Sequence, residues 1–214
     1  MTTLFGSREL PLEAMASADQ LAPPSEPLEG ALPITTMAAD SKWWRIHRTE
    51  QRPVFFGPAP GRPPTYRFDA PGGEYRILYL GQSLSAAFVE TLPRNPRIPF
   101  IEQSELEERS VAVLTNQHPL NLVDLRGGGL SQIGVDNRLT TGSYEVAGRW
   151  ALALWRHSDR PDGILYRSKN DPNHICAAIF ARGHCEFAVA TTTPLMDIPR
   201  HWAAILGAHG KGIA

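Results

Sequence analysis

The chain contains little cysteine and no long apolar run, and both absences narrow its class. Its two cysteines, Cys176 and Cys185, are too few for the disulfide framework of a small secreted domain. No apolar stretch approaches the ~20 residues that cross a bilayer. The first residues lack the charged start and apolar run of a signal peptide. We therefore expect a globular domain with an extra segment, in the reducing cytoplasm and without membrane contact.

A surplus of charge is also absent. The formal net charge is -1 over 214 residues, which predicts no direct contact with nucleic acid. Lysine occurs only at positions 42, 169 and 211, so arginine carries almost all of the positive charge. This is compatible with forked recognition of anions, and equally with the base composition of the genome.

Proline separates the chain into two parts. Residues 1–40 are rich in proline and small residues and show no sustained period, which predicts an N-terminal extension or arm with a short helix around Leu12–Gln20. Residues 41–214 form the predicted domain. Within it, the proline- and glycine-rich loop 53–65 is long for a compact fold, which favours a functional loop or lid.

Hydrophobic periodicity predicts more strands than helices in this domain. Helices are expected at 83–92, 143–157 and 198–206. Strands are expected at 42–48, 76–80, 108–115, 120–125, 162–168, 174–181 and 185–190. Helices interspersed among a majority of strands predict an α+β fold.

One predicted helix carries an isolated carboxylate. Ser83, Ala86, Ala87 and Glu90 lie three or four residues apart, which places them on one side of a helix. Only small residues precede the acid on that side. This pattern favours a face that leaves room for a ligand.

Five polar residues lie at or near predicted strand or helix ends: Arg45, Arg67, Tyr79, Glu90 and Ser168. Arg45 lies inside an apolar strand and Arg67 follows the long loop, so each needs an anion from the protein or from a ligand. Two guanidiniums can bind a diphosphate, a tyrosine can stack, and a glutamate can stabilise positive charge at a sugar carbon. The set suits a nucleotide with a diphosphate and a labile glycosidic bond. The alternative is an Arg–Glu ion pair that ties a strand to a helix.

Other patterns are weaker. His174, Cys176, His184 and Cys185 are zinc-ligand types without Cys-x-x-Cys or His-x-x-x-His spacing, so no metal is expected. Residues 126–130, R-G-G-G-L, lack the P-loop and dinucleotide patterns, which indicates a flexible turn. The tryptophans at helical spacing are typical of a core, although Trp44 adjoins Arg45 and could stack on adenine. Ser168 lacks a nucleophile-elbow context, and His47 is a further candidate base.

Four stretches together resemble the RES domain family over roughly residues 42–190. They are W-R-I at 44–46, Y-R-F followed by P-G-G at 66–73, L-Y-L-G-Q-S-L-S-A-A-F-V-E at 78–90 and G-I-L-Y-R-S at 163–168. The family is named for an arginine, a glutamate and a serine. The resemblance implies a mixed β core similar to ADP-ribosyltransferases, and a bacterial toxin that consumes NAD+ by hydrolysis or phosphorolysis or transfers ADP-ribose to a protein.

The resemblance also implies a role for each matching residue. Arg45 and Arg67 would grip the phosphates or the nicotinamide ribose side of NAD+, with Arg45 in the catalytic set. Tyr79 would line the nicotinamide pocket, Glu90 would be the catalytic acid, and Ser168 would complete the pocket wall. No metal cofactor is implied, the partner would be a helix-turn-helix antitoxin of the Xre type, and a homodimer is left open.

Two positions bear on which molecule accepts the ADP-ribose group of NAD+. Many arginine-directed transferases have a glutamine or glutamate two residues before the catalytic glutamate, where this chain has Phe88. NAD+ destruction is therefore favoured over mono-ADP-ribosylation of a protein, and a nucleotide- or partner-binding module without catalysis is the alternative from another class. Lys169 stands where a small residue or an arginine is expected.

Overall fold

The computed structural model describes residues 21–22, 24, 28–93, 95 and 97–214. The helix predicted around Leu12–Gln20 lies outside these residues. Eight strands form the main sheet: β1 (Ile34–Met37), β2 (Lys42–Arg48), β3 (Ile77–Gly81), β5 (Arg109–Asn116), β6 (Leu120–Asp124), β7 (Gly163–Arg167), β8 (Ile175–Phe180) and β9 (Phe187–Pro194). Their order is β1-β6-β7-β8-β3-β2-β5-β9.

The sheet is mixed, because β6 and β7 run parallel while the other neighbours are antiparallel. A separate two-stranded ladder joins β4 (Phe100–Ile101) to β10 (Gly212–Ile213). This arrangement confirms the predicted α+β class. No helix among the described residues is long and apolar enough to cross a membrane.

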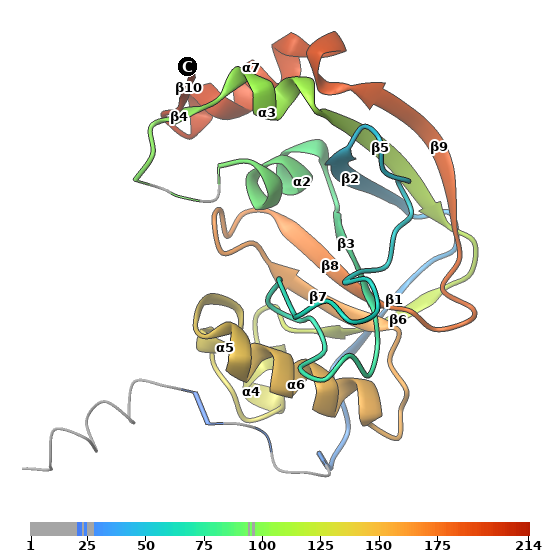
Figure 1. Cartoon of the computed structure of the whole chain (residues 1–214). Coiled ribbons are helices and arrows are strands. Elements are labelled where there is room, and N and C mark those ends of the chain that lie inside the picture. Colours follow the sequence, from blue (N-terminus) through green and yellow to red (C-terminus); the bar gives the residue numbers. More distant parts are fainter. Residues whose placement is uncertain (1–20, 23, 25–27, 94, 96) are drawn as a thin grey trace, which may run out of the picture.

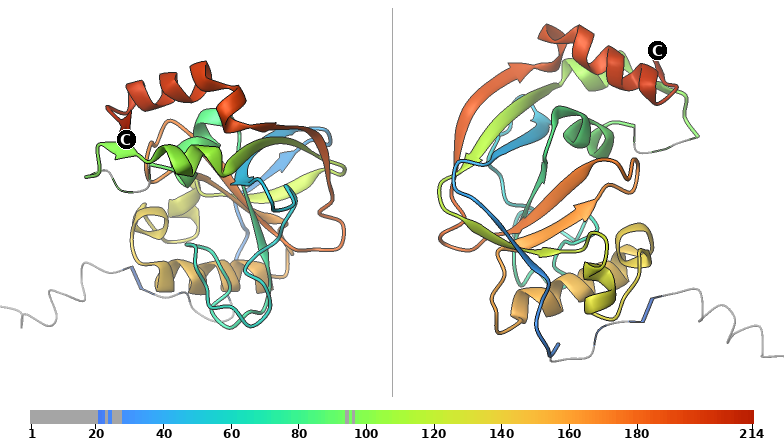
Figure 2. Two further views of the ribbon diagram at one scale, coloured as in Figure 1. Left: turned by 45° about the horizontal axis from the view of Figure 1, so that its top comes forward. Right: turned by 180° about the vertical axis from the view of Figure 1, so that it is seen from behind.

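Helices gather in two groups (Figures 1 and 2). One group holds α2 (Leu84–Thr91), α3 (Gln103–Glu107), the 3-10 turn η1 (Leu195–Asp197) and α7 (Pro199–Ala208). The other holds α4 (Gly129–Gln132), α5 (Arg138–Thr141) and α6 (Tyr144–Arg156). All three predicted helices are confirmed, as α2, α6 and α7, with Ser83 as N-cap of α2 and Ser143 as N-cap of α6.

The apolar core follows the predicted stripes. In α6, Trp150 packs with Phe68 and Phe180 in one buried cluster. Trp43 of β2 is fully buried in a second cluster, together with Leu78 and Leu165 from the other half of the sheet. Burying each such side chain stabilises the fold by roughly 1.5–3 kcal/mol. The second cluster, with residues from both halves of the sheet, holds these halves together.

The main sheet opens between β2 and β3. β2 pairs with β5 along its whole length, but its ladder to β3 consists of one pair, Trp44 with Gly81. Helix α2 packs against both strands at this opening. A Cβ on Gly81 would lie 2.6 Å from the backbone nitrogen of Ala87, so glycine permits this close approach of helix and strand. The opening leaves space for a cavity.

Part of the predicted N-terminal extension belongs to the sheet. β1 is an edge strand that pairs with β6. Leu32 is buried, and the indole N–H of Trp150 donates to the carbonyl of Ala22 at 2.9 Å. These contacts anchor residues that the composition assigns to an arm.

Candidate active site

A cavity of about 350 Å³ lies where β2 and β3 separate. Its walls are residues 44–48 of β2, 79–81 of β3, 65–67 of the long loop and 169–170 after β7, with four residues of α2. Ala86, Ala87 and Glu90 are among those four, as the helical spacing predicts. The small side chains of α2 therefore face an open space that ends at a carboxylate.

The Glu90 carboxylate is held by Ser168. Ser168 Oγ donates to Glu90 Oε1 at 2.5 Å and accepts from the backbone N–H groups of Asn170 and Asp171 at 3.0 and 3.1 Å. Asn170 Nδ2 also donates to the carbonyl of Val89 at 2.9 Å. Ser168 is buried and does not itself line the cavity. Its place in the structure is that of a residue that positions Glu90.

Arg45 enters the cavity from β2. Its Nη1 donates to the carbonyl of Pro53 at 2.6 Å, which ties the long loop to the strand. Burial lowers the pKa of the guanidinium to about 10. Among the described residues, no carboxylate forms an ion pair with Arg45. The need for an anion, expected from an arginine in an apolar strand, is met only in part by a carbonyl dipole.

Arg67 likewise forms no ion pair with a carboxylate among the described residues. It is 7% exposed, its Nη1 donates to the carbonyl of Gly142 at 2.8 Å, and its guanidinium lies 4.6 Å from the centre of the Tyr144 ring. Its Nη2 is buried and has no hydrogen-bond partner in the part of the chain that the structure describes. Desolvation lowers the pKa of Arg67. A buried donor without an acceptor is costly, so this atom indicates a place for a ligand oxygen.

Tyr79 contributes its ring rather than its hydroxyl. The hydroxyl donates to Asp69 Oδ1 and accepts from the N–H of Phe68, both at 3.0 Å. Burial raises the pKa of Tyr79. Its ring lies edge-on to Tyr66 with centroids 5.4 Å apart. Because Asp69 also accepts from the N–H groups of Thr65 and Tyr66, Tyr79 fixes the loop that carries Arg67.

His47 offers a second polar atom without a partner. Its Nδ1 lies 2.8 Å from the carbonyl of Arg48, and a carbonyl only accepts, so Nδ1 carries the proton. Nε2 is then an acceptor, and it is buried at the cavity without a hydrogen-bond partner among the described residues. Burial lowers the pKa of His47, which keeps the ring neutral at neutral pH. A ligand N–H or O–H would satisfy it.

The cavity is rich in positive charge. Besides Arg45 and Arg67, it is lined by Arg48, Arg109 and Lys169. Arg48 pairs with Glu108, and Arg109 pairs with Glu105 at 2.5 Å. The inner arginines are thus the ones that keep their charge available to an anion.

Sequence patterns missed several lining residues, including Thr140, Tyr144 and Asn170. They stand in a short helix, at a helix start and in a loop, so no strand or helix period marks them. Trp44 lines the cavity, as its position beside Arg45 allows.

The remaining candidates from the sequence, apart from Cys176, lie away from the cavity. Cys176 lines the cavity, where burial raises the pKa of its thiol. His174 lies beside Asp171, and His184 and Cys185 lie beside Asp162, so the four zinc-ligand types do not form one cluster. Arg126 of the glycine-rich turn makes a two-pronged contact with Asp124, and the turn does not line the cavity. Ser168 donates to Glu90, so it is not arranged as a nucleophile activated by His174.

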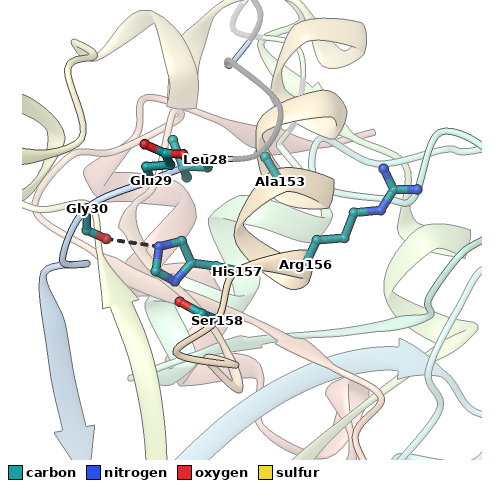
Figure 3. A pocket seen from close by; sticks show the side chains of 7 residues that line it. All are labelled: Leu28, Glu29, Gly30, Ala153, Arg156, His157 and Ser158. Atoms are coloured by element: carbon teal, nitrogen blue, oxygen red, sulfur yellow. Dashed lines mark hydrogen bonds between the residues drawn. The ribbon is translucent and has the colours of Figure 1, made fainter.

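A second hollow, of about 710 Å³, lies between residues 28–30 and the end of α6 (Figure 3). His157 Nε2 donates to the carbonyl of Gly30 at 2.9 Å, and its Nδ1 accepts from the N–H of Asp159 at 3.1 Å. Both ring nitrogens are therefore used in holding the chain together. The smaller cavity, with its converging charges and unpartnered atoms, is the candidate active site.

Comparisons with known proteins identify the family of the chain. The model of the RES domain family matches residues 42–203. "Probable toxin y4kH" of Sinorhizobium fredii (strain NBRC 101917 / NGR234) is 34% identical over 104 residues, which are 48% of this chain and 81% of that protein.

A solved structure shows the same fold. A chain of the M. tuberculosis MbcT–MbcA toxin–antitoxin complex matches with a TM-score of 0.58 at 16% identity, over 75% of this chain and 88% of that one. The family match spans both sides of the cavity, from β2 to α7. The chain belongs to the RES domain family.

Proposed function

We propose that this protein is the toxin of a toxin–antitoxin pair and that it cleaves the nicotinamide–ribose bond of NAD+ in the cytoplasm. One observation carries the proposal. A carboxylate held by Ser168 faces a cavity whose two buried arginines have no carboxylate partner among the described residues. The names of the relatives, a probable toxin and a toxin–antitoxin complex, support the cellular role.

The arginines suit the diphosphate of NAD+. Arg45 and Arg67 each donate to one backbone carbonyl, which leaves N–H groups of both guanidiniums for a further acceptor. Guanidinium–phosphate hydrogen bonds are charge-assisted and about twice as strong as neutral ones. A bound diphosphate would supply the anion that both side chains lack.

Glu90 would act at the ribose. When the nicotinamide–ribose bond breaks, its electron pair leaves on the nicotinamide nitrogen and positive charge develops on the anomeric carbon. A carboxylate beside that carbon stabilises the charge. Water then bonds to the carbon through its oxygen and gives a proton to solvent, or an unprotonated oxygen of inorganic phosphate bonds to the carbon directly.

The acceptor is proposed to be water or phosphate. Phe88, two residues before Glu90, is fully buried in the core and does not line the cavity. That position therefore presents no polar side chain to an arginine of a target protein. Mono-ADP-ribosylation of a protein is the second candidate. A module that binds a nucleotide or partner without turnover is a third, and a helix-turn-helix antitoxin is the proposed partner of the toxin.

The test is nicotinamide release from NAD+ by purified protein, with and without inorganic phosphate. Glu90→Gln keeps the shape of the side chain and removes its charge, and we expect it to reduce release by on the order of 100-fold or more. Glu145→Gln is the matched control, because Glu145 is an exposed glutamate on α6 that pairs with Arg149.

Each outcome separates the candidates. Release that requires Glu90 supports NAD+ cleavage, and a dependence on phosphate distinguishes phosphorolysis from hydrolysis. Absence of release, with labelled ADP-ribose appearing on a protein in cell extract, would favour the transferase. NAD+ binding without either reaction would favour the binding module.

A further inference from the structure

A second group of ligand-type side chains lies next to the residues that hold Glu90. Asp171 and His174 belong to the loop between β7 and β8, and His209 caps the end of α7. One ligand atom from each lies within 4.8 Å of the others. All three side chains are between 20% and 24% exposed, so a small cation can reach them from solvent.

The distances match those of ligands that share one metal ion. Asp171 Oδ2 lies 3.1 Å from His209 Nε2 and 3.5 Å from His174 Nε2. Atoms bound tetrahedrally to Zn²⁺ at ~2.0–2.1 Å are separated by roughly 3.3 Å. Both candidate groups contain a hydrogen bond between a histidine and a carboxylate, but Asp162 Oδ1 and His184 Nε2 are only 2.6 Å apart, which is closer than two ligands of one Zn²⁺ ion lie. Burial also raises the pKa of Cys185, beside Asp162, to about 12, which disfavours the thiolate.

The hydrogen bonding of His209 strengthens the assignment. Its Nδ1 lies 2.8 Å from the carbonyl of Ile205, and because a carbonyl only accepts, Nδ1 carries the proton. Nε2 of the same ring faces Asp171 Oδ2 at 3.1 Å. A cation bound between these two atoms would replace that hydrogen bond without moving the ring. A histidine that donates through Nδ1 to a carbonyl and binds metal through Nε2 is the usual arrangement in zinc proteins.

We propose that Asp171, His174 and His209 form a binding site for Zn²⁺, with water as the fourth ligand. Two imidazoles and one carboxylate are a donor set that this ion favours. The site departs from the expectation of no metal drawn from the sequence. It does not depend on the proposed reaction with NAD+.

The site would secure the loop that positions Glu90. The backbone N–H of Asp171 donates to Ser168 Oγ, which in turn donates to Glu90 Oε1. A metal ion on the Asp171 side chain would fasten this loop to α7, an element that otherwise lies outside the cavity wall. Asp171 and His174 do not line the cavity, so the ion is structural rather than part of the reaction.

The test uses full-length protein stripped with a chelator and titrated with Zn²⁺ by calorimetry. We expect one equivalent to bind, with His174→Asn and His209→Asn each weakening affinity by about tenfold or more. His184→Gln, in the group around Asp162, is the matched control and should bind as the wild type does. Substitution by Co²⁺ should give the visible absorption bands of a tetrahedral site.

Thermal unfolding keeps the test valid if one variant is less stable. Zn²⁺ should raise the melting temperature of the wild type and of His184→Gln, and should leave that of His174→Asn unchanged. His174→Asn serves here because His209 also bonds to the end of α7. Failure of the wild type to bind Zn²⁺, or equal binding by both variants and the wild type, would overturn the proposal and leave a protonated ion pair.

Discussion

Arginines on the surface and arginines in the cavity differ in the partners of their guanidinium groups. Arg138 and Arg149, both well exposed, each pair with a carboxylate two or four residues away. Arg45 and Arg67 are buried, and among the described residues they contact backbone carbonyls and a ring but no carboxylate. Surface pairs contribute only ~0–1 kcal/mol, whereas an unpaired buried charge is costly. Among the described residues the buried arginines thus form no ion pair, which supports the proposal that a ligand supplies the anion.

The largest expected effect on NAD+ binding comes from removing the charge of Arg45 in β2. Arg45→Ala should weaken NAD+ binding by roughly 2–5 kcal/mol, or on the order of 30- to 5,000-fold, because it removes a desolvated partner of the diphosphate. Calorimetry with the variant measures this. Arg149→Ala, an exposed arginine, is the control and should stay within about 0.5 kcal/mol of the wild type in stability and bind NAD+ equally. An equal loss of NAD+ affinity in Arg45→Ala and Arg149→Ala would contradict the distinction between buried and exposed arginines.

Replacing Arg67 by an apolar side chain separates binding from stability. Arg67→Met should weaken NAD+ binding by roughly 1.5–3 kcal/mol. It should change the free energy of unfolding by less than about 1 kcal/mol, because losing the hydrogen bond to Gly142 is offset by removing a buried charge and a donor without a partner among the described residues. Urea unfolding and calorimetry give the two quantities. Arg126→Met is the opposite case, because it strips Asp124 of its partner and should not affect NAD+. A strongly destabilised Arg67→Met would mean that Arg67 is structural.

A smaller effect on the reaction rate is expected at Ser168, which donates a hydrogen bond to Glu90. Ser168→Ala removes the hydrogen bond to the carboxylate, and should lower the rate of nicotinamide release by about tenfold, which corresponds to ~1.4 kcal/mol. The Michaelis constant should change less than the rate, because Ser168 does not line the cavity. A variant with full activity would show that Glu90 is positioned without Ser168.

The smallest effect concerns pH. Burial lowers the pKa of His47, so between about pH 7 and pH 5 the unfolded state binds more protons than the folded state, and stability falls as the pH falls. His47→Gln should lose less stability than the wild type over this range in urea unfolding. His118→Gln, on an exposed turn, is the control and should follow the wild type. Parallel curves for wild type and His47→Gln would contradict the account.

The strands and long helices could be predicted because each carries its own signal. The α2 boundaries follow from the cap at Ser83, and α6 follows from a stripe of apolar residues at helical spacing. β1 was missed, since I-T-T-M is short, lies among prolines and is stabilised by pairing with β6 rather than by its own pattern. Helices α3, α4 and α5 were missed because four or five residues are too few to show a period.

The candidate site was predictable in part for the same reason. Arg45 and Arg67 stand out as charges in unusual places, and Glu90 stands out at the end of a face of small residues. The contact between Ser168 and Glu90 joins residues 78 positions apart, and the sequence suggested it only through the family resemblance. The group formed by Asp171 and His209 spans 38 positions and had no signal, because the fold alone brings α7 to the loop.

The central claim is that the cavity keeps its arginines for the diphosphate of NAD+. The most direct test titrates the Glu90→Gln protein with NAD+ and, separately, with nicotinamide riboside, which lacks the diphosphate. We predict that NAD+ binds at least about tenfold more tightly, and that adding Arg45→Ala removes most of this difference. Equal affinity for the two ligands, or no binding of NAD+, would contradict the account.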